Sequence, residues 1–365
     1  MKTKNTKSFA SRWGFILASV GSAVGMANVW GFPNKMGSNG GGAFLLIYLL
    51  FVVIFSTVGL PTEFAMGRRA GTGTLGAYEN AWATRGKTAG KVVVLLGWLP
   101  LSGSLCIAIG YAVIVTYILK ALVDSLLGTL MTGDAAVWFA SFSTQPYSVI
   151  PYHVIVVAGT LLTLFLGAHS IEKTNKVMMP LFFLIFVVLA VRVALLPGSA
   201  EGYKFMFSPD FSVFSNPEIG FGRVLKNAAG QMFFSLSIGL GVMMTYGSYL
   251  GKQEHLQRNA LIVCGADTLI AVMAGMAVMP ACAAFGVEYG AGPGLLFASM
   301  QTVFAHMGSI GNFIGFIFYL LVLIAALTSS ISMLELCTAY AVDKQIDKGL
   351  TPKRAKHTAS VAALV

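Results

Sequence analysis

Apolar residues along the chain gather into eight long runs separated by short polar segments. Runs of about 20 apolar residues with few charges are typical of helices that cross a bilayer. The runs predict helices at residues 12–33, 42–66, 92–123, 152–170, 175–196, 222–249, 259–285 and 309–342. A ninth run begins near residue 357 and continues to Val365. The pattern predicts an all-α polytopic membrane protein, with residues 1–365 forming a single transmembrane domain.

The first run contains residues that interrupt a helix. Its second half reads GSAVGMANVWGFP, from Gly21 to Pro33, and includes three glycines, a serine, an asparagine and a proline. Each glycine costs about 1 kcal/mol of helix propensity relative to alanine. A helix that only had to span the membrane would gain nothing from this cost. The stretch therefore predicts a helix that unwinds within the bilayer.

The sixth run contains a second interruption. In GQMFFSLSIGLGVMMTYGSYL, Ser235 and Ser237 precede Gly239 and Gly241 in the middle of the run. Unwound backbone within a membrane is tolerated where it lines a cavity or is buried in protein. Paired broken helices point to a transport site near the bilayer midplane, so breaks in the first and sixth helices predict two five-helix repeats around such a site. The alternative is that the glycines only permit close helix packing.

Composition agrees with a membrane protein, because 56% of residues are hydrophobic and only 10% are charged. The mean hydropathy is +0.77, and soluble domains carry about 25% charged residues. The net charge is +10, and 18 of the 24 Lys and Arg residues fall on one side of the membrane when the N-terminus is cytoplasmic. This positive-inside bias predicts the orientation and explains the basic surplus without a nucleic-acid partner. A basic start before an apolar run also fits a cleaved signal peptide, but further membrane helices follow it.

The interruptions supply chemistry suited to a small cation and a carboxylate. Unwinding frees backbone carbonyl oxygens, and half-helix N-termini direct partial positive charge at an anionic group. The eighth run adds hydroxyl groups in AALTSSIS, where Thr328, Ser329 and Ser330 are adjacent. Hydroxyls in a membrane helix also bond back to the preceding turn, so these residues alone leave both interpretations open.

Three acidic residues lie within apolar runs, where a carboxylate is costly unless it has a partner. Asp267 has no Lys or Arg within eight residues on either side, so a bound cation is a candidate partner. Glu63 is expected to bond the unwound backbone of a neighbouring helix. Glu335 lies seven residues after Thr328 on the same helix face, and a structural and a gating role are both open for it.

These motifs occur together in one known family. The motifs that carry the resemblance are, in chain order, GSAVGMANVWGFP, NGGGAF, LPTEFAMGRR, GQMFFSLSIG and ALTSSIS. Through them the chain resembles the neurotransmitter:sodium symporter family, and most closely its bacterial amino-acid transporters. The resemblance extends over essentially the whole chain. It implies an inverted-repeat fold, with helices 1–5 and 6–10 related by a pseudo-two-fold axis in the membrane plane. It also implies sodium-driven amino-acid uptake by alternating access across a bacterial inner membrane.

The resemblance places two sodium sites and a substrate pocket on this chain. One sodium site would use the backbone oxygen of Ala23 and the side chains of Asn28, Ser235 and Asp267. The other would use the backbone oxygens of Gly21, Val24 and Ala325 and the hydroxyls of Thr328 and Ser329. The substrate pocket would comprise Ser22, Ala23, Met26, Ala27, Ile107, Tyr111, Phe234, Ser235, Ser237, Leu240, Ser329 and Met333. Tyr111 would donate its hydroxyl to the substrate carboxylate, and Phe234 would form an aromatic lid.

Three positions depart from the family pattern. Gly31 stands where many relatives have a basic residue that forms an outer gate with an acid on the tenth helix. Asp267 stands where asparagine is common, and Ala271 replaces the serine of chloride-dependent members. The other residues similar to a chloride site are Tyr48, Gln231 and Ser235. Since a carboxylate near sodium offsets its charge directly, transport is expected not to require chloride.

The chain is shorter than members of the family, which have eleven or twelve helices. The second repeat is therefore expected to be incomplete, and a truncated, transport-inactive membrane fragment is the alternative to a transporter. An ion channel is a further alternative, whereas the scattered histidines argue against an enzyme. The apolar Leu240 and Met333, with the small Ser22 and Ser237, predict a neutral amino acid with a large apolar or aromatic side chain. The pattern predicts no oligomeric state.

Overall fold

A computed structural model of the chain describes residues 11–130, 132–133, 135–166, 168–251, 253–289, 297, 300–351, 354–355 and 358–359. Within these ranges the protein is helical, and a bridge between Gly41 and Pro209 is the only strand-like contact. Five helices are long and apolar enough to cross a membrane, and a bent pair of helices forms a sixth span. The predicted all-α membrane architecture is confirmed for the part of the chain that the structure describes.

The first span is broken at the glycine-rich stretch, as predicted. Helix α1 (Arg12–Ala23) ends where Val24 takes an extended conformation, with φ −74° and ψ 111°. The chain continues as a π-helical turn, η1 (Ala27–Gly31), and a short helix, α2 (Phe32–Gly37). The two halves of this span differ in direction by 49°. The backbone groups around Val24 are therefore free to face neighbouring helices.

The second predicted break lies between α11 (Gly220–Ser235) and α12 (Val242–Ser248). Within it, Ser237, Gly239 and Gly241 have positive φ angles of 53°, 82° and 82°. Glycine adopts this conformation without steric cost, whereas a serine in it is strained. The unwound segment therefore depends on its two glycines, and the surrounding structure holds Ser237 in an unfavourable backbone conformation.

The other spans are continuous helices. They are α3 (Gly42–Ile54) with the π-helical η2 (Phe55–Gly59) and α4 (Leu60–Ala70), and then α6 (Lys87–Leu126), α9 (Ala168–Ala194), α13 (Leu256–Phe285) and α15 (Gly311–Asp347). A shorter apolar helix, α8 (Ile150–Leu166), packs against α6 and α9. Helices thus occur at all eight predicted runs, with ends that differ by several residues. The predicted ninth run lies almost entirely outside the described residues.

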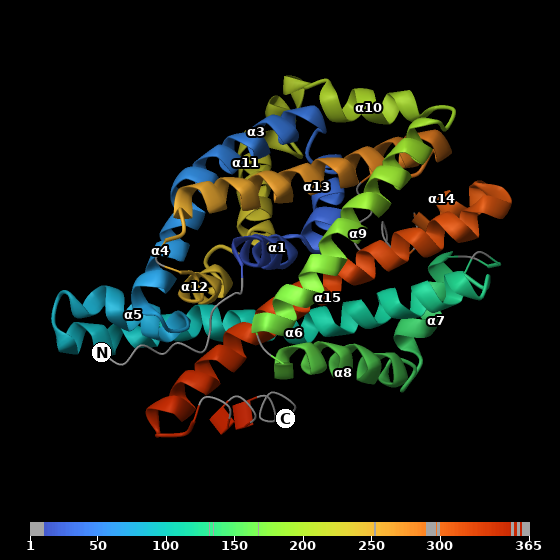
Figure 1. Ribbon diagram of the computed structural model, residues 1–365. Coiled ribbons are helices and arrows are strands. Elements are labelled where there is room, and N and C mark those ends of the chain that lie inside the picture. Colours follow the sequence, from blue (N-terminus) through green and yellow to red (C-terminus); the bar gives the residue numbers. More distant parts are fainter. Residues whose placement is uncertain are drawn as a thin grey trace.

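Several short helices connect the spans and were not predicted. They are α5 (Thr74–Ala83), α7 (Ala135–Thr144), α10 (Ser199–Phe207) and α14 (Met300–His306), with the 3-10 turns η3 (Phe211–Ser215) and η5 (Gly308–Ile310). Helix α5 lies at one end of the long helices, and α7, α10 and α14 lie at their opposite ends (Figure 1). Each is too short to cross a membrane, so a search for long apolar runs passes over it.

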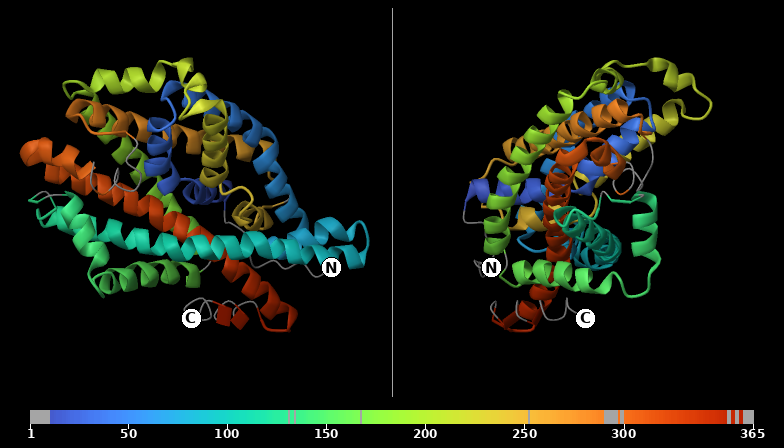
Figure 2. Two further views of the ribbon diagram at one scale, coloured as in Figure 1. Left: turned by 180° about the vertical axis from the view of Figure 1, so that it is seen from behind. Right: turned by 90° about the vertical axis from the view of Figure 1, so that its right-hand side faces the viewer.

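Helix α1 lies in the interior of the bundle, whereas α11 is partly exposed and packs against α3 (Figure 1). Helix α1 packs against α9, α13 and α15, and α15 crosses α6 over an extensive contact that both further views also show (Figure 2). Large apolar side chains face outward on the peripheral spans, as for Leu50 on α3, Leu95 on α6 and Val188 on α9. Outward apolar faces suit a lipid environment, so the polar groups described below are concentrated inside the bundle.

Candidate functional site

A small cavity lies beside both breaks, between α1, α6, the α11–α12 break and α15. Its lining consists of Ser22, Ala23, Gly25, Met26, Ala27, Ile107, Tyr111, Phe234, Ser237, Leu240, Ser329 and Met333. Eleven of these are residues predicted to form the substrate pocket, and Gly25 is the addition. The cavity volume is about 30 Å³, and one water needs about 10–15 Å³. The walls must therefore move apart before an amino acid can enter.

Gly25 brings the α1 break close to α6 and α15. A Cβ atom at this position would lie 2.3 Å from Ser329 Oγ and 3.1 Å from the hydroxyl oxygen of Tyr111. The next residue, Met26, donates its backbone N–H to that Tyr111 oxygen over 3.2 Å. Because the phenol oxygen acts as the acceptor in this bond, its O–H group can still donate to a ligand in the cavity.

Asn28, Ser235 and Asp267 form a polar cluster beside the cavity, and all three are fully buried. Asn28 Nδ2 donates to Asp267 Oδ1 at 2.8 Å, to the Asp267 carbonyl at 3.1 Å and to Ser235 Oγ at 3.0 Å. Ser235 Oγ lies 2.9 Å from each carboxylate oxygen, as the donor. Ser235 therefore faces Asp267 and does not line the cavity. Asp267 forms no ion pair with any described residue, so hydrogen bonds alone stabilise its carboxylate.

The Asn28 amide directs its nitrogen atom, and not its oxygen atom, toward Asp267. Its Oδ1 atom accepts the backbone N–H of Gly25 at 3.1 Å, so that Nδ2 faces Asp267. Sodium would be bound by an oxygen atom, and in this orientation Asn28 presents none to the carboxylate. A cation between Ser235 and Asp267 would replace the amide N–H groups, and Asn28 could then bind it only after its amide had rotated.

A second group of oxygen atoms lies where α1 ends against α15. Ser329 Oγ donates to the Val24 carbonyl across the two helices at 3.3 Å. Thr328 Oγ1 bonds back to the Ala325 carbonyl at 2.9 Å, as hydroxyls within a membrane helix often do. A Cβ atom on Gly21 would lie 3.5 Å from Thr328 Cβ. The five residues predicted for this sodium site thus lie together, and all their oxygens are neutral.

Buried polar groups also hold the α11–α12 break in place. Glu63 Oε1 accepts the backbone N–H of Gly239 at 2.7 Å, which confirms the expected bond to unwound backbone. Thr74 Oγ1 on α5 donates to the Gly241 carbonyl at 2.8 Å. Burial, followed by the charge of Glu63, raises the pKa of Tyr78 on α5. The short helix α5 therefore contacts the break through Thr74.

Helix α12 and its C-cap residue, Tyr249, are joined to α15 by two hydrogen bonds between side chains. The Tyr249 hydroxyl donates to Glu335 Oε1 at 2.6 Å, and the hydroxyls of Tyr246 and Ser332 lie 2.8 Å apart. Glu335 is buried and lies one to two turns beyond Ser329 and Ser332 on α15. These contacts give Glu335 a structural role in linking the second broken helix to α15.

The residues that resemble a chloride site lie beside the Asp267 cluster. Tyr48, Gln231 and Ala271 are fully buried, and Gln231 Nε2 donates to the Ala27 carbonyl at 2.6 Å. A Cβ atom on Gly31 would lie 3.4 Å from Gln231 Oε1. Position 31 therefore faces a neutral amide and carries no side chain that could form an outer ion pair.

The beginning of α1 is tied to two other helices. Ser11 Oγ donates to Glu172 Oε1 on α9 at 3.0 Å. Arg12 Nε donates to Asn259 Oδ1 on α13 at 3.0 Å and lies 3.5 Å from Glu254 Oε2. The partners are far apart in sequence, so the pattern of residues along the chain gave no indication of these contacts.

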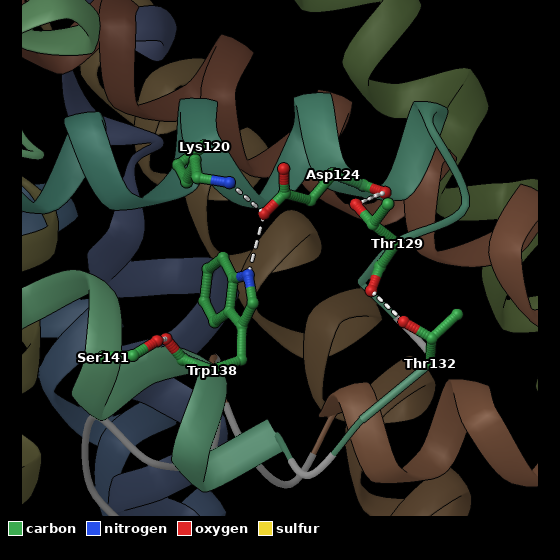
Figure 3. A network of polar contacts seen from close by, with 6 residues as sticks. All are labelled: Lys120, Asp124, Thr129, Thr132, Trp138 and Ser141. Carbon is green, nitrogen blue, oxygen red and sulfur yellow. Dashed lines mark hydrogen bonds and ion pairs between the residues drawn. The ribbon is translucent and has the colours of Figure 1, made fainter.

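Another polar network lies away from the breaks, between α6 and α7 (Figure 3). The Asp124 carboxylate accepts hydrogen bonds from Lys120 on the same helix and from Trp138 Nε1 on α7, the latter at 2.8 Å. Thr129 Oγ1 donates to the Asp124 carbonyl at 3.2 Å. The network fixes the connection from α6 to α7, and none of its residues lines the cavity.

One buried amide near the second oxygen group was not anticipated. Asn175 on α9 is fully buried, and its Oδ1 atom lies against Gly21. In the sequence it stands between Lys173 and Lys176, which makes the segment read as a polar helix end. The signal that could have revealed it is helical spacing, because Glu172 and Asn175 are three residues apart, and both are buried on the face of α9 that packs against α1.

The chain is similar over most of its length to known sequences and structures. The sequence profile described as the "Sodium:neurotransmitter symporter family" matches residues 6–148 and 144–365. An "uncharacterized sodium-dependent transporter" of Haemophilus influenzae is 35% identical over 340 residues, which cover 91% of this chain and 73% of that protein. The "uncharacterized sodium-dependent transporter YhdH" of Bacillus subtilis is 35% identical over 367 residues, covering 98% and 76%. The crystal structure of MhsT in complex with L-phenylalanine matches with a TM-score of 0.84 at 34% identity, covering 98% of this chain and 78% of that one.

Proposed function

This chain belongs to the sodium:neurotransmitter symporter family, and we propose that it couples sodium entry to the uptake of a neutral amino acid with a large apolar or aromatic side chain. The observation that carries the proposal is a cavity between two broken helices with an oxygen cluster on either side. Alternating access would open this cavity first to one side of the membrane and then to the other. The chain would lie in a bacterial inner membrane with its N-terminus in the cytoplasm.

The two ends of the proposed substrate have matching groups in the cavity. A carboxylate would accept a hydrogen bond from the Tyr111 hydroxyl and face the N-terminal end of the half-helix that follows the α1 break, since half-helix N-termini attract anionic groups. The apolar side chain would lie against Ile107, Leu240, Met333 and Phe234. None of the lining residues is charged, so a charged side chain would be buried without a partner. L-phenylalanine bound to MhsT is consistent with this substrate class.

Two sodium ions would bind beside the substrate. The first would lie among Ala23, Asn28, Ser235 and Asp267, with the Asp267 carboxylate as its main source of attraction. The second would lie among the neutral oxygens of Gly21, Val24, Ala325, Thr328 and Ser329. Because coupling between binding sites is reciprocal, sodium should tighten substrate binding, and substrate should tighten sodium binding by the same factor.

The direct test is equilibrium binding of labelled amino acids to the purified 365-residue chain, in sodium and in potassium. Phenylalanine, tryptophan, leucine and methionine are expected to bind in sodium alone, and lysine and glutamate in neither salt. Tyr111→Phe should weaken binding at least about tenfold, because a hydrogen bond to a charged group contributes about 1.5–3 kcal/mol. Tyr117→Phe is the matched control on the same helix, since Tyr117 packs against Phe139 and Phe142.

Four results would count against the proposal. Binding of the same amino acids in potassium would refute sodium coupling, and tight binding of lysine or glutamate would refute the substrate class. Sodium conductance in liposomes without saturable amino-acid binding would favour a channel. If the chain binds no amino acid in either salt, it is a transport-inactive membrane protein, and the proposal fails.

A further inference from the structure

We propose that Asn175 is an additional oxygen ligand of the second sodium site, so that α9 contributes to this site together with α1 and α15. The inference rests on the proposed function, because it concerns the same sodium ion. It adds a side chain that the resemblance to the family did not place in this site.

The hydrogen bonds of the Asn175 amide fix its orientation. Asn175 is fully buried on α9, and its Nδ2 atom donates to the Ile171 carbonyl at 2.9 Å. That carbonyl can only accept, so the amide nitrogen must face it and the amide oxygen must face the opposite way. The opposite direction is toward α1.

The Asn175 oxygen meets the second oxygen cluster at Gly21. A Cβ atom on Gly21 would lie 1.9 Å from Asn175 Oδ1 and 3.5 Å from Thr328 Cβ. The amide oxygen, the Gly21 backbone and Thr328 are thus grouped around one point, and any side chain at position 21 would separate them. This close approach is a reason for glycine at position 21 that is independent of the helix break.

The same oxygen is unpaired in the protein. Asn175 Oδ1 has no hydrogen-bond partner among the described residues. Leaving a buried polar atom unsatisfied costs about 1–3 kcal/mol, and a cation bound at the cluster would satisfy it. An amide oxygen is also a neutral, hard donor like the backbone carbonyls of Gly21, Val24 and Ala325, and such donors replace the hydration shell of an alkali ion.

A purely structural role for Asn175 is the competing explanation, and sodium titration separates the two. The melting temperature of the purified chain would be measured against sodium concentration at constant ionic strength, without substrate. Asn175→Ala removes the oxygen without adding bulk, and Asn175→Asp keeps an oxygen at the same place. Gln301→Ala is the matched control, because Gln301 is another buried amide with unpaired polar atoms and does not line the cavity.

The half-saturating sodium concentration should rise about tenfold or more in Asn175→Ala, the scale of losing a group that supports a metal ion. It should return to within about threefold of the wild-type value in Asn175→Asp and stay unchanged in Gln301→Ala. In the double variant that carries Asn175→Ala and Thr328→Ala, the rise in the half-saturating sodium concentration should be smaller than the product of the two single rises. The reason is that both residues contact the same ion. When Asn175→Ala is combined with Asn28→Ala, which affects the first site, the rise in the half-saturating sodium concentration should equal the product of the two single rises.

Each contrary result has a distinct meaning. A lower melting temperature with an unchanged half-saturating sodium concentration in Asn175→Ala would show that Asn175 is only a packing residue, and would overturn this inference alone. A wild-type chain whose melting temperature does not respond to sodium would refute the two sodium sites of the proposed function, and this inference with them.

Discussion

The two oxygen clusters beside the cavity are built from different chemistry. The first contains a buried carboxylate, Asp267, bonded to Asn28 and Ser235, whereas the second contains only hydroxyl, carbonyl and amide oxygens around Thr328. A buried charge without a basic partner is costly, so a cation at the first cluster removes a penalty that the second cluster does not have. At the proposed sodium sites we therefore expect Asp267 to dominate the affinity, with the neutral cluster contributing through the number and placement of its oxygens.

Gly25 is the point at which the two clusters meet, and changing it should have the largest effect. Its N–H bonds to Asn28 Oδ1 in the first cluster, and a Cβ atom would lie 2.3 Å from Ser329 Oγ in the second. Gly25→Ala is expected to abolish sodium-dependent amino-acid binding, measured with labelled phenylalanine. Gly230→Ala on α11 is the control, since a Cβ atom there meets nothing within 4 Å. Normal binding by Gly25→Ala would mean that the clusters do not depend on their close approach.

Removing the charge of the first cluster should have the next largest effect. Asp267→Asn keeps the size of the side chain but is expected to raise the half-saturating sodium concentration about 100-fold, because losing one partner of a buried charge pair costs about 2–5 kcal/mol. The half-saturating sodium concentration would be measured from substrate binding at increasing sodium concentrations. Glu63→Gln is the matched control, because this buried carboxylate bonds the Gly239 backbone. If Asp267→Asn responds to sodium like the wild type, the charge does not hold the ion.

Removing one hydroxyl from the neutral cluster should have a smaller effect. Thr328→Ala is expected to raise the half-saturating sodium concentration about tenfold, on the scale of one lost metal contact. Thr338→Ala on the same helix is the control, because the Thr338 hydroxyl bonds back to the Leu334 carbonyl in the same way but lies outside the cluster. If Thr328→Ala and Thr338→Ala have the same half-saturating sodium concentration, the back-bonded hydroxyl of Thr328 is structural.

Replacing chloride should have the smallest effect of all. Uptake into liposomes with gluconate in place of chloride is expected to change less than about twofold, because the Asp267 carboxylate supplies the negative charge next to sodium. The residues around it, Tyr48, Gln231 and Ala271, are uncharged. A collapse of uptake in gluconate would show that a free anion is needed in addition to Asp267.

The positions of both helix breaks could be predicted from the sequence, because glycines and small polar residues within an apolar run lower its helix propensity. The gathering of the cavity residues followed from motifs that resemble one family. The bond from Glu63 to unwound backbone was also anticipated, since a buried carboxylate near a break has few other partners.

Features that depend on tertiary contacts could not be predicted. The amide orientation of Asn28 depends on the hydrogen bond from the Gly25 N–H. The position of Asn175 Oδ1 beside Gly21 depends on how α9 packs on α1. The local sequence around Asn28 and Asn175 indicates neither of these contacts. The short helices α5, α7, α10 and α14 were missed for a different reason, because they are shorter than a membrane span.

The π-helical turn η1 has a consequence for the alignment of this span. Each residue of an α-helix turns the chain by about 100° and advances it by about 1.5 Å, and a π-helical turn accommodates one residue more than an α-helical turn. Deleting one residue within Ala27–Gly31 would therefore let this turn close as an ordinary α-helical turn, with α2 kept in its present angular phase. Phe32 would then keep its contact with Tyr48, at 5.0 Å between ring centroids. The turn thus accommodates one extra residue beside the break without rotating the helix that follows it.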